Sequence, residues 1–186
     1  MNNLKDAIMA FVPYNEQEEK DKTFFLEFME KNEDVLTRNN RVAHFTASNW
    51  IVNKERTKVL MIYHNIYQSW AWTGGHADGD ADLFHVACKE AEEESSISGL
   101  KPIQDGIFSL EVLTVDGHVK RGEYVSSHLH LNCTFVFEAD ENLELKIKED
   151  ENSGVQWIDI DKAPEITTEA HMPAIYEKLN AKLKQL

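Results

Sequence analysis

Cysteine is nearly absent from this chain of 186 residues, which contains only Cys88 and Cys133 and no C-x-x-C pair. A disulfide framework or a cysteine-ligated metal site needs more cysteines or a closer spacing. We therefore expect both thiols to be reduced and partly buried.

Long apolar runs are missing as well. No run approaches the ~20 apolar residues that a membrane helix requires. The first residues, Met1–Asp6, lack the basic start and the apolar stretch of a signal peptide. Together these absences predict a cytoplasmic protein without a membrane partner.

Basic residues are few. The chain has 19 lysines and arginines and 33 aspartates and glutamates, which gives a formal net charge of -14. Stable binding to long DNA or RNA is typical of chains with a basic patch, which this sequence does not show. A small phosphorylated substrate is compatible with the charge, because divalent cations bridge carboxylates to phosphate.

The remaining composition, 42% hydrophobic and 28% charged residues, is that of a globular protein. No internal repeat or low-complexity linker divides the chain. Residues 1–40 are predicted to be a helical N-terminal extension, in which Phe24, Phe25, Phe28 and Met29 recur at helical spacing. This extension can pack on the main domain or form a homodimer contact, and the sequence leaves both open.

From residue 41 the pattern alternates between strands and helices. A helix is predicted from Asp82, or from Asp80, to about Ser95, and a last helix from about Glu169. Strands are expected at residues 42–52, 59–64, 107–115, 129–137 and 155–158, and residues 70–73 are a short aromatic stretch that leads into the paired glycines. Residues 41–186 therefore predict one α/β domain, with a mixed sheet covered by helices on both faces.

The segment that carries chemistry is Gly74–Ile97. Its helix presents an apolar stripe of Leu83, Ala87 and Ala91, and a second face with Glu90, Glu93 and Glu94. Like charges at this spacing cost a helix roughly 0.2–0.5 kcal/mol per pair. Either a divalent cation such as Mg²⁺ offsets that repulsion, or the face is simply solvated, and spacing alone does not decide.

Residues Gly75–Ile97 resemble the Nudix signature, G-x(5)-E-x(7)-R-E-U-x-E-E-x-G-U, where U is a bulky apolar residue. Gly75 matches the first glycine, and the last three glutamates of the signature are Glu90, Glu93 and Glu94. The resemblance implies a Nudix-type α/β/α sandwich with a mixed sheet. It also implies a hydrolase that cleaves the diphosphate linkage of a nucleoside diphosphate derivative.

This box is degenerate at three positions. Ala81 stands where the family has its first glutamate, Lys89 where it has arginine and Ser96 where it has glycine. Lys89 keeps the charge but lacks the planar guanidinium that orients a catalytic carboxylate. Asp80 or Asp82 can replace the missing carboxylate, although each is one position out of register. These departures predict attenuated activity.

By resemblance, Mg²⁺ or Mn²⁺ is held by Glu90, Glu93 and Glu94, with a backbone carbonyl near Gly74. The general base is Glu93 or a carboxylate of the acidic loop, represented by Glu151, and the family does not fix the choice. Lys89 takes the place of the arginine that serves the catalytic carboxylate.

Substrate contacts are expected from residues outside the glutamate face. His76 follows the paired glycines directly, and Trp72 can stack a base or pack in the core. Arg121 can meet a phosphate or remain solvated. His128 and His130 alternate on a predicted strand and so share one face, where they serve phosphate, metal or structure.

Two other functions compete with hydrolysis. The box substitutions are compatible with a catalytically weak nucleotide sensor. His44–Trp50 and Gly75-His76 resemble isopentenyl-diphosphate isomerases, but the catalytic cysteine of that family is Gly74 here. The substrate stays open among ADP-ribose, dinucleoside polyphosphates, nucleoside triphosphates and coenzyme A.

Overall fold

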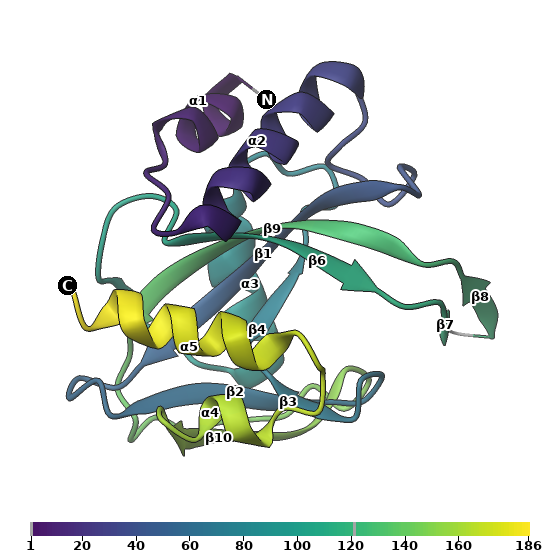
Figure 1. The fold of residues 1–186 in the computed structure, drawn as a ribbon. Helices are drawn as coiled ribbons and strands as arrows, with labels where there is room; N and C mark the ends of the chain where they lie inside the picture. The colour runs from purple at the N-terminus through teal and green to yellow at the C-terminus, as the bar shows by residue number, and fades with distance from the viewer. Residues whose placement is uncertain (1, 121) are drawn as a thin grey trace.

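The computed structural model describes residues 2–120 and 122–186, which form a mixed β-sheet with helices on both faces (Figure 1). The strands are β1 (Ala43–Val52), β2 (Lys58–His64), β3 (Ser69–Ala71), β4 (Thr73–His76), β5 (Lys101–Pro102), β6 (Ser109–Val115), β7 (His118–Lys120), β8 (Glu123–Val125), β9 (His128–Glu138) and β10 (Asn152–Asp159). The helices are α1 (Asn2–Ala10), α2 (Glu16–Lys31), α3 (Leu83–Ser95), α4 (Ala163–Ile166) and α5 (Met172–Leu183).

The centre of the sheet is the parallel pair β1 and β9, in the strand order β10-β2-β1-β9-β5. The shorter strands β3, β4 and β6 pair with β2, β1 and β9, and all of these other pairs are antiparallel. Side chains alternate along β1, so His44, Thr46 and Ser48 share one face while Phe45 and Ala47 share the other. This alternation separates a polar face from an apolar one near the start of β1.

Helix α3 covers the apolar face. Its predicted stripe of Leu83, Ala87 and Ala91 is buried, and it belongs to the same core as Phe45 and Leu131. Helix α5 covers the other face, where Tyr176 stacks on Trp50 with ring centroids 5.0 Å apart. In Figure 1, α5 lies in front of the sheet and α3 behind it.

The expected N-terminal helices are present and pack on the sheet. Phe25 of α2 is fully buried and meets Phe45 edge to face, with ring centroids 5.5 Å apart. Leu4 and Ile8 of α1 are buried in the same core. Part of the apolar surface of the extension is therefore used within the chain itself, whereas Met9, Val12 and Phe24 are exposed.

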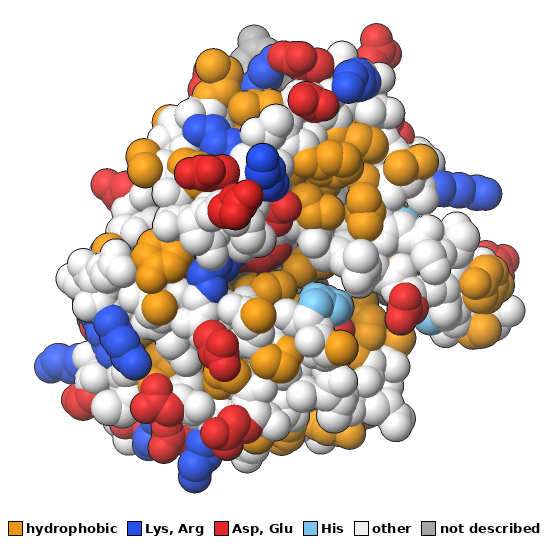
Figure 2. Space-filling view, viewed as in Figure 1, with side chains coloured by type: hydrophobic (Ala, Val, Ile, Leu, Met, Phe, Trp, Pro, Cys, Tyr) orange, Lys and Arg blue, Asp and Glu red, His pale blue; other side chains and the backbone are white. Residues whose placement is uncertain are grey.

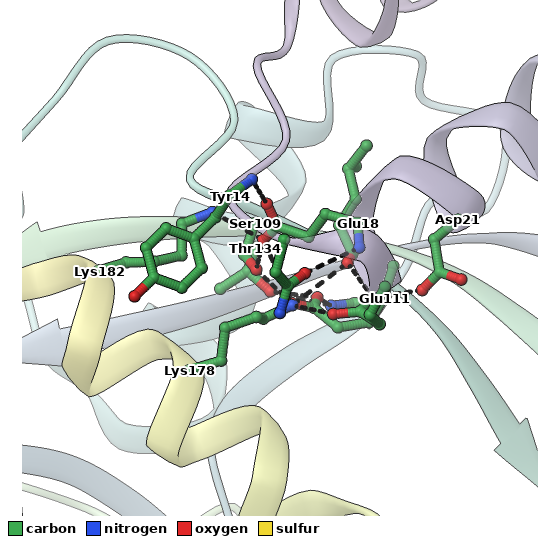
Figure 3. A network of polar contacts seen from close by, with 12 residues as sticks. Tyr14, Glu18, Asp21, Ser109, Glu111, Thr134, Lys178 and Lys182 are labelled. Carbon is green, nitrogen blue, oxygen red and sulfur yellow. Dashed lines mark hydrogen bonds and ion pairs between the residues drawn. The ribbon is translucent and has the colours of Figure 1, made fainter.

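A buried network of charges joins α2 to α5 across the edge of the sheet (Figure 3). Lys182 Nζ donates to Glu18 Oε1 at 2.7 Å, and Ser109 Oγ donates to the same oxygen at 2.6 Å. Lys178 Nζ lies 3.0 Å from Glu111 Oε1 and 3.3 Å from Glu18 Oε1. The network is stable in a dry environment because each carboxylate meets an ammonium group.

Three local features differ from the sequence interpretation. The polar loop expected between β6 and β9 contains a short hairpin of β7 and β8. The two-residue strand β5 and the one-turn helix α4 were not predicted, because such short elements carry no periodic signal. Cys88 and Cys133 are free thiols, as expected.

The surface carries charges of both signs. On the face viewed in Figure 2, basic side chains are scattered among acidic ones. No helix within residues 2–120 and 122–186 combines the length and the apolar character needed to cross a bilayer.

Candidate functional site

Two aspartates organise the start of α3. Asp82 is the N-cap, and its Oδ1 accepts the backbone N–H of His85 at 3.1 Å. Asp80 Oδ1 accepts the backbone N–H of Asp82 at 2.9 Å, and its Oδ2 lies 2.8 Å from His85 Nδ1. Both carboxylates therefore serve the first turn of the helix, which is where the sequence predicted a cap.

Helix α3 ends at Ser96, which has φ 59° and ψ 14°, the left-handed conformation. Its backbone N–H donates to Glu92 O at 2.8 Å. Glycine adopts this conformation without a steric penalty, whereas serine has a Cβ in an unfavourable place. The chain keeps the turn although it lacks the glycine.

We expect Ser96→Gly to raise the free energy of unfolding by about 0.5–1 kcal/mol, because it relieves the strain of a left-handed serine. Urea unfolding measures the change. Ser98→Gly is the control, since Ser98 is exposed and has no positive φ, and it should not stabilise the chain. Equal effects of the two substitutions would contradict this explanation.

The paired glycines lie against two glutamates of α3. A Cβ at Gly75 would lie 2.3 Å from Cδ of Glu90, so any larger residue would displace that carboxylate. The backbone N–H of Gly74 donates to Glu94 Oε2 at 2.8 Å. A Cβ at Gly74 would lie 2.5 Å from Ala47 O. Glycine therefore lets the backbone approach helix α3 closely at position 75 and strand β1 closely at position 74.

Four carboxylates and two lysines gather at this end of α3. We call Glu90, Glu93, Glu94 and Glu151 the carboxylate cluster. Lys148 Nζ lies 3.1 Å from Glu93 Oε2 and 3.1 Å from Glu151 Oε2, so it holds both general-base candidates. Lys89, on the surface of α3, lies 3.5 Å from Glu93 Oε1 and 4.0 Å from Glu90 Oε1.

The electrostatic environments of these carboxylates differ. Burial raises the pKa of Glu94 to about 8, and the charges of Glu90 and Glu151 add to the rise. Burial also raises the pKa of Glu90. In contrast, the hydrogen bond from Lys148 lowers the pKa of exposed Glu93. Negative charge is therefore disfavoured at the inner carboxylates and favoured at the outer one.

An ion pair that the sequence analysis missed fixes the loop before α3. Arg38 Nε donates to Asp78 Oδ1 at 2.8 Å, and a second guanidinium nitrogen donates to Asp78 Oδ2. The backbone N–H of Gly79 donates to Leu36 O at 3.0 Å. Residues 36–38 thus hold the loop of the box from outside. A long sequence separation hides such a pair from pattern analysis.

The imidazoles of four histidines converge on the polar face of the sheet, with ligand nitrogens that all lie within 4.8 Å of one another. We call them the four-histidine cluster: His44, His76, His128 and His130. The parallel register aligns His44 with His130, and β4 adds His76 opposite Thr46. Within residues 2–120 and 122–186, this group converges as metal ligands do, and the box glutamates do not form such a group.

Comparisons with known proteins identify the family of this chain. The model of the NUDIX domain matches residues 43–179, which is more than half of the chain. The chain belongs to the Nudix hydrolase family. An RNA pyrophosphohydrolase of Pelagibacter ubique (strain HTCC1062) is 25% identical to this Nudix hydrolase over 140 residues, 73% of this chain and 88% of the relative.

Solved structures are similar in fold. The binary complex of the C. elegans Ap4A hydrolase has a TM-score of 0.57 at 18% identity, over 76% of this chain and 98% of that one. The E. coli dihydroneopterin triphosphate pyrophosphohydrolase has a TM-score of 0.53 at 15% identity, over 72% and 92%. The predicted Nudix-type sandwich and the predicted class of enzyme, a pyrophosphate-bond hydrolase, are confirmed.

Residues of this Nudix hydrolase suit the divalent cation that the family implies. Mg²⁺ and Mn²⁺ prefer carboxylate and carbonyl oxygens, which the carboxylate cluster and the glycine backbone offer. The Glu90 carboxylate, a potential metal ligand, fills the space beside Gly75 and so lies directly against the glycine backbone. Repulsion among these carboxylates is the penalty that a cation would remove.

Other predicted contact residues of the Nudix hydrolase have different places. Trp72 is 8% exposed and packs on Tyr176, with ring centroids 5.6 Å apart. Of the two predicted roles for Trp72, stacking a base or packing in the core, the structure shows core packing. Arg121 lies outside the described residues. A surface hollow of about 860 Å³ lies between α1 and the start of α3, beside Leu4 and Phe84, and no member of the carboxylate cluster lines it.

Proposed function

We propose that this Nudix hydrolase is a metal-dependent enzyme that cleaves the diphosphate linkage of a small nucleoside diphosphate derivative. The observation that carries the proposal is the carboxylate cluster, packed against the glycine backbone that has no room for a side chain. A small substrate is favoured over long nucleic acid because the net charge is -14.

Glu90 and Glu94, together with Glu93, would hold Mg²⁺ or Mn²⁺. When bound, the cation neutralises phosphate charge and lowers the pKa of the attacking water. The inner position of Glu94, fixed by the Gly74 N–H, supports its role as a ligand rather than as a base.

Glu93 or Glu151 would accept the proton of the water as its oxygen attacks phosphorus and the bridging P–O bond breaks. Lys148 contacts both carboxylates and restricts their orientation. Partial burial opposes the charge of Lys148, but its hydrogen bonds to Glu93 and Glu151 outweigh this and raise its pKa. Lys148 therefore stays positive and keeps Glu93 ionised.

We expect removal of divalent metal with EDTA to abolish turnover, and Mg²⁺ or Mn²⁺ to restore it, because the cation would neutralise phosphate charge and activate the attacking water. Product release from ADP-ribose, dinucleoside polyphosphates, nucleoside triphosphates and coenzyme A measures the rate and ranks the substrates. A short RNA with a 5′-triphosphate belongs in the panel, because the Pelagibacter relative is an RNA pyrophosphohydrolase.

Turnover that persists in EDTA would contradict metal dependence. A compound that raises the unfolding temperature without being hydrolysed would favour the nucleotide sensor instead. In that case the substitutions at Ala81, Lys89 and Ser96 become the explanation for the lost chemistry.

A further inference from the structure

The four-histidine cluster has no role in the proposed hydrolysis. It lies on the opposite side of β4 from the carboxylate cluster, because Gly75 faces Glu90 and the next residue, His76, faces the other side of the strand. Two clusters of potential ligands, one of oxygen and one of nitrogen, therefore flank the same short strand.

Hydrogen bonds to backbone carbonyl oxygens set the tautomer of two of these histidines. His44 Nδ1 lies 3.0 Å from Asn40 O, and His128 Nδ1 lies 2.8 Å from Ser126 O. A carbonyl oxygen accepts only, so each Nδ1 carries a hydrogen. In the neutral imidazole, the Nε2 atom of each ring then carries no hydrogen and can offer its lone pair to a metal ion. Backbone carbonyls orient many metal-binding histidines in this way.

One of these unprotonated nitrogens is buried without a hydrogen-bond partner. His44 is 3% exposed, and its Nε2 makes no hydrogen bond. A buried polar atom left unpaired costs about 1–3 kcal/mol, so native structures rarely keep one without a reason. The rings of His76, His128 and His130 surround this nitrogen, with centroids 5.0–5.1 Å from that of His44.

The spacing of the nitrogens suits a shared ion. His128 Nε2 and His130 Nε2 lie 3.2 Å apart. Two imidazole nitrogens bound tetrahedrally to Zn²⁺ at 2.0–2.1 Å are about 3.3 Å from each other. The largest separation in the cluster, 4.8 Å, is wider, so rotation of the half-exposed rings would close the shell. Their partial exposure also provides a path of entry.

We propose that the four-histidine cluster binds a divalent transition metal ion of the Zn²⁺ class, at a site separate from the carboxylate cluster. Four imidazole nitrogens suit Zn²⁺, Ni²⁺ or Cu²⁺ and do not suit Mg²⁺, which prefers oxygen. The ion ties β1, β4 and β9 together next to the loop of the Nudix box.

Binding of Zn²⁺ and Co²⁺ to the full chain tests this site. The metal-stripped protein, made without a histidine tag, is titrated in millimolar Mg²⁺, which occupies oxygen sites and leaves imidazole sites free. We expect one Zn²⁺ per chain, and visible absorption of bound Co²⁺ with the intensity of tetrahedral coordination. Nε2 resonances of the cluster should shift in ¹⁵N NMR spectra when Zn²⁺ is added.

His130→Gln and His128→Gln should each weaken Zn²⁺ binding by about 100-fold or more. His171→Gln is the matched control, because His171 is exposed and lies outside the cluster, and it should bind as the wild type does. If His130→Gln does not fold, the His76→Gln variant decides, because His76 is also partly exposed. Glu94→Gln should leave Zn²⁺ binding intact, which separates this test from that of the hydrolase.

Absence of stoichiometric Zn²⁺ and Co²⁺ binding would overturn the proposal. Binding that is unchanged in both His128→Gln and His130→Gln would overturn it equally. The cluster would then be a hydrogen-bonded stack in which His130 Nε2–H donates to His128 Nε2.

Discussion

Glu94→Gln should lower the rate of metal-dependent hydrolysis by about 100- to 1000-fold, while the chain stays folded. A loss of this size corresponds to roughly 3–4 kcal/mol of stabilisation of the transition state. Glutamine keeps an oxygen that accepts the Gly74 N–H, so the local geometry survives. It removes the charge that a cation would need. Single-turnover rates at saturating Mg²⁺ measure the effect.

Glu92→Gln is the matched control for this variant, because Glu92 is exposed on the same helix and outside the carboxylate cluster. Its rate should equal that of the wild type. The unfolding temperature without metal should not fall in Glu94→Gln, since burial already disfavours the charge of Glu94 and glutamine is neutral. Stabilisation by added Mg²⁺ should be lost. Undiminished hydrolysis by Glu94→Gln would show that the chemistry takes place elsewhere.

Glu18→Ala should lower the free energy of unfolding by about 3–5 kcal/mol, because it leaves the buried Lys182 without a carboxylate. The side chain of Glu18 is fully buried and accepts hydrogen bonds from Lys182, Ser109 and the backbone N–H of Tyr14. For a chain of this length, such a loss corresponds to a fall of about 10 °C in unfolding temperature. Urea unfolding and calorimetry measure both quantities.

The neighbouring Glu19→Ala is the control, because Glu19 is exposed on the same helix and should change stability by less than about 0.5 kcal/mol. Replacing both partners, in Glu18→Met with Lys182→Met, should recover most of the lost stability, since no unpaired charge remains. A small effect of Glu18→Ala alone would mean that water reaches Lys182.

The same carboxylate predicts how this effect depends on pH. Burial opposes ionisation of Glu18, but hydrogen bonds from Lys182 and Ser109 and the charge of Lys178 outweigh it and lower its pKa. A carboxyl group with a lowered pKa stabilises the fold above its unfolded pKa and loses that contribution as pH falls through its folded pKa. The stability gap between the wild type and Glu18→Ala should therefore narrow as the pH falls below about 4.

The balance between burial and hydrogen bonding affects the pKa values of the two partners, Glu18 and Lys182, differently. Burial lowers the pKa of Lys182, and its hydrogen bond to Glu18 offsets only part of that. Glu18 accepts from several donors, whereas Lys182 meets one carboxylate. The protein thus stabilises the anion of the pair more than the cation.

Much of the fold could be predicted from periodicity. The strands at β1 and β2 and the apolar stripe of α3 each follow from a local pattern, and each is confirmed. The position of α2 was harder to predict. Glu18 lies in a run of charged residues that indicates a solvated helix, yet it is buried because Lys182, far along the chain, supplies its partner.

Prediction of the candidate site is limited in the same way, because local patterns do not specify contacts between distant segments. Short spacings placed Glu90, Glu93 and Glu94 on one face of the helix and predicted a cap at Asp82 or Asp80, of which Asp82 is the N-cap. His128 and His130 were correctly placed on one face of a strand. Their meeting with His44 depends on the parallel register of β1 and β9, which no local pattern specifies. His44 had been assigned only to a strand, although its polar character on a buried strand was a signal.

The separation of 164 positions between Glu18 and Lys182 also bears on how the chain is made. The ribosome releases α2 well before α5, and contacts between such distant segments form late in folding. A nascent chain that stops before Lys178 carries Glu18 and Glu111 without either ammonium group. Such a fragment leaves these buried carboxylates unpaired, so chains that lack α5 are exposed to proteases while chains that include it are protected.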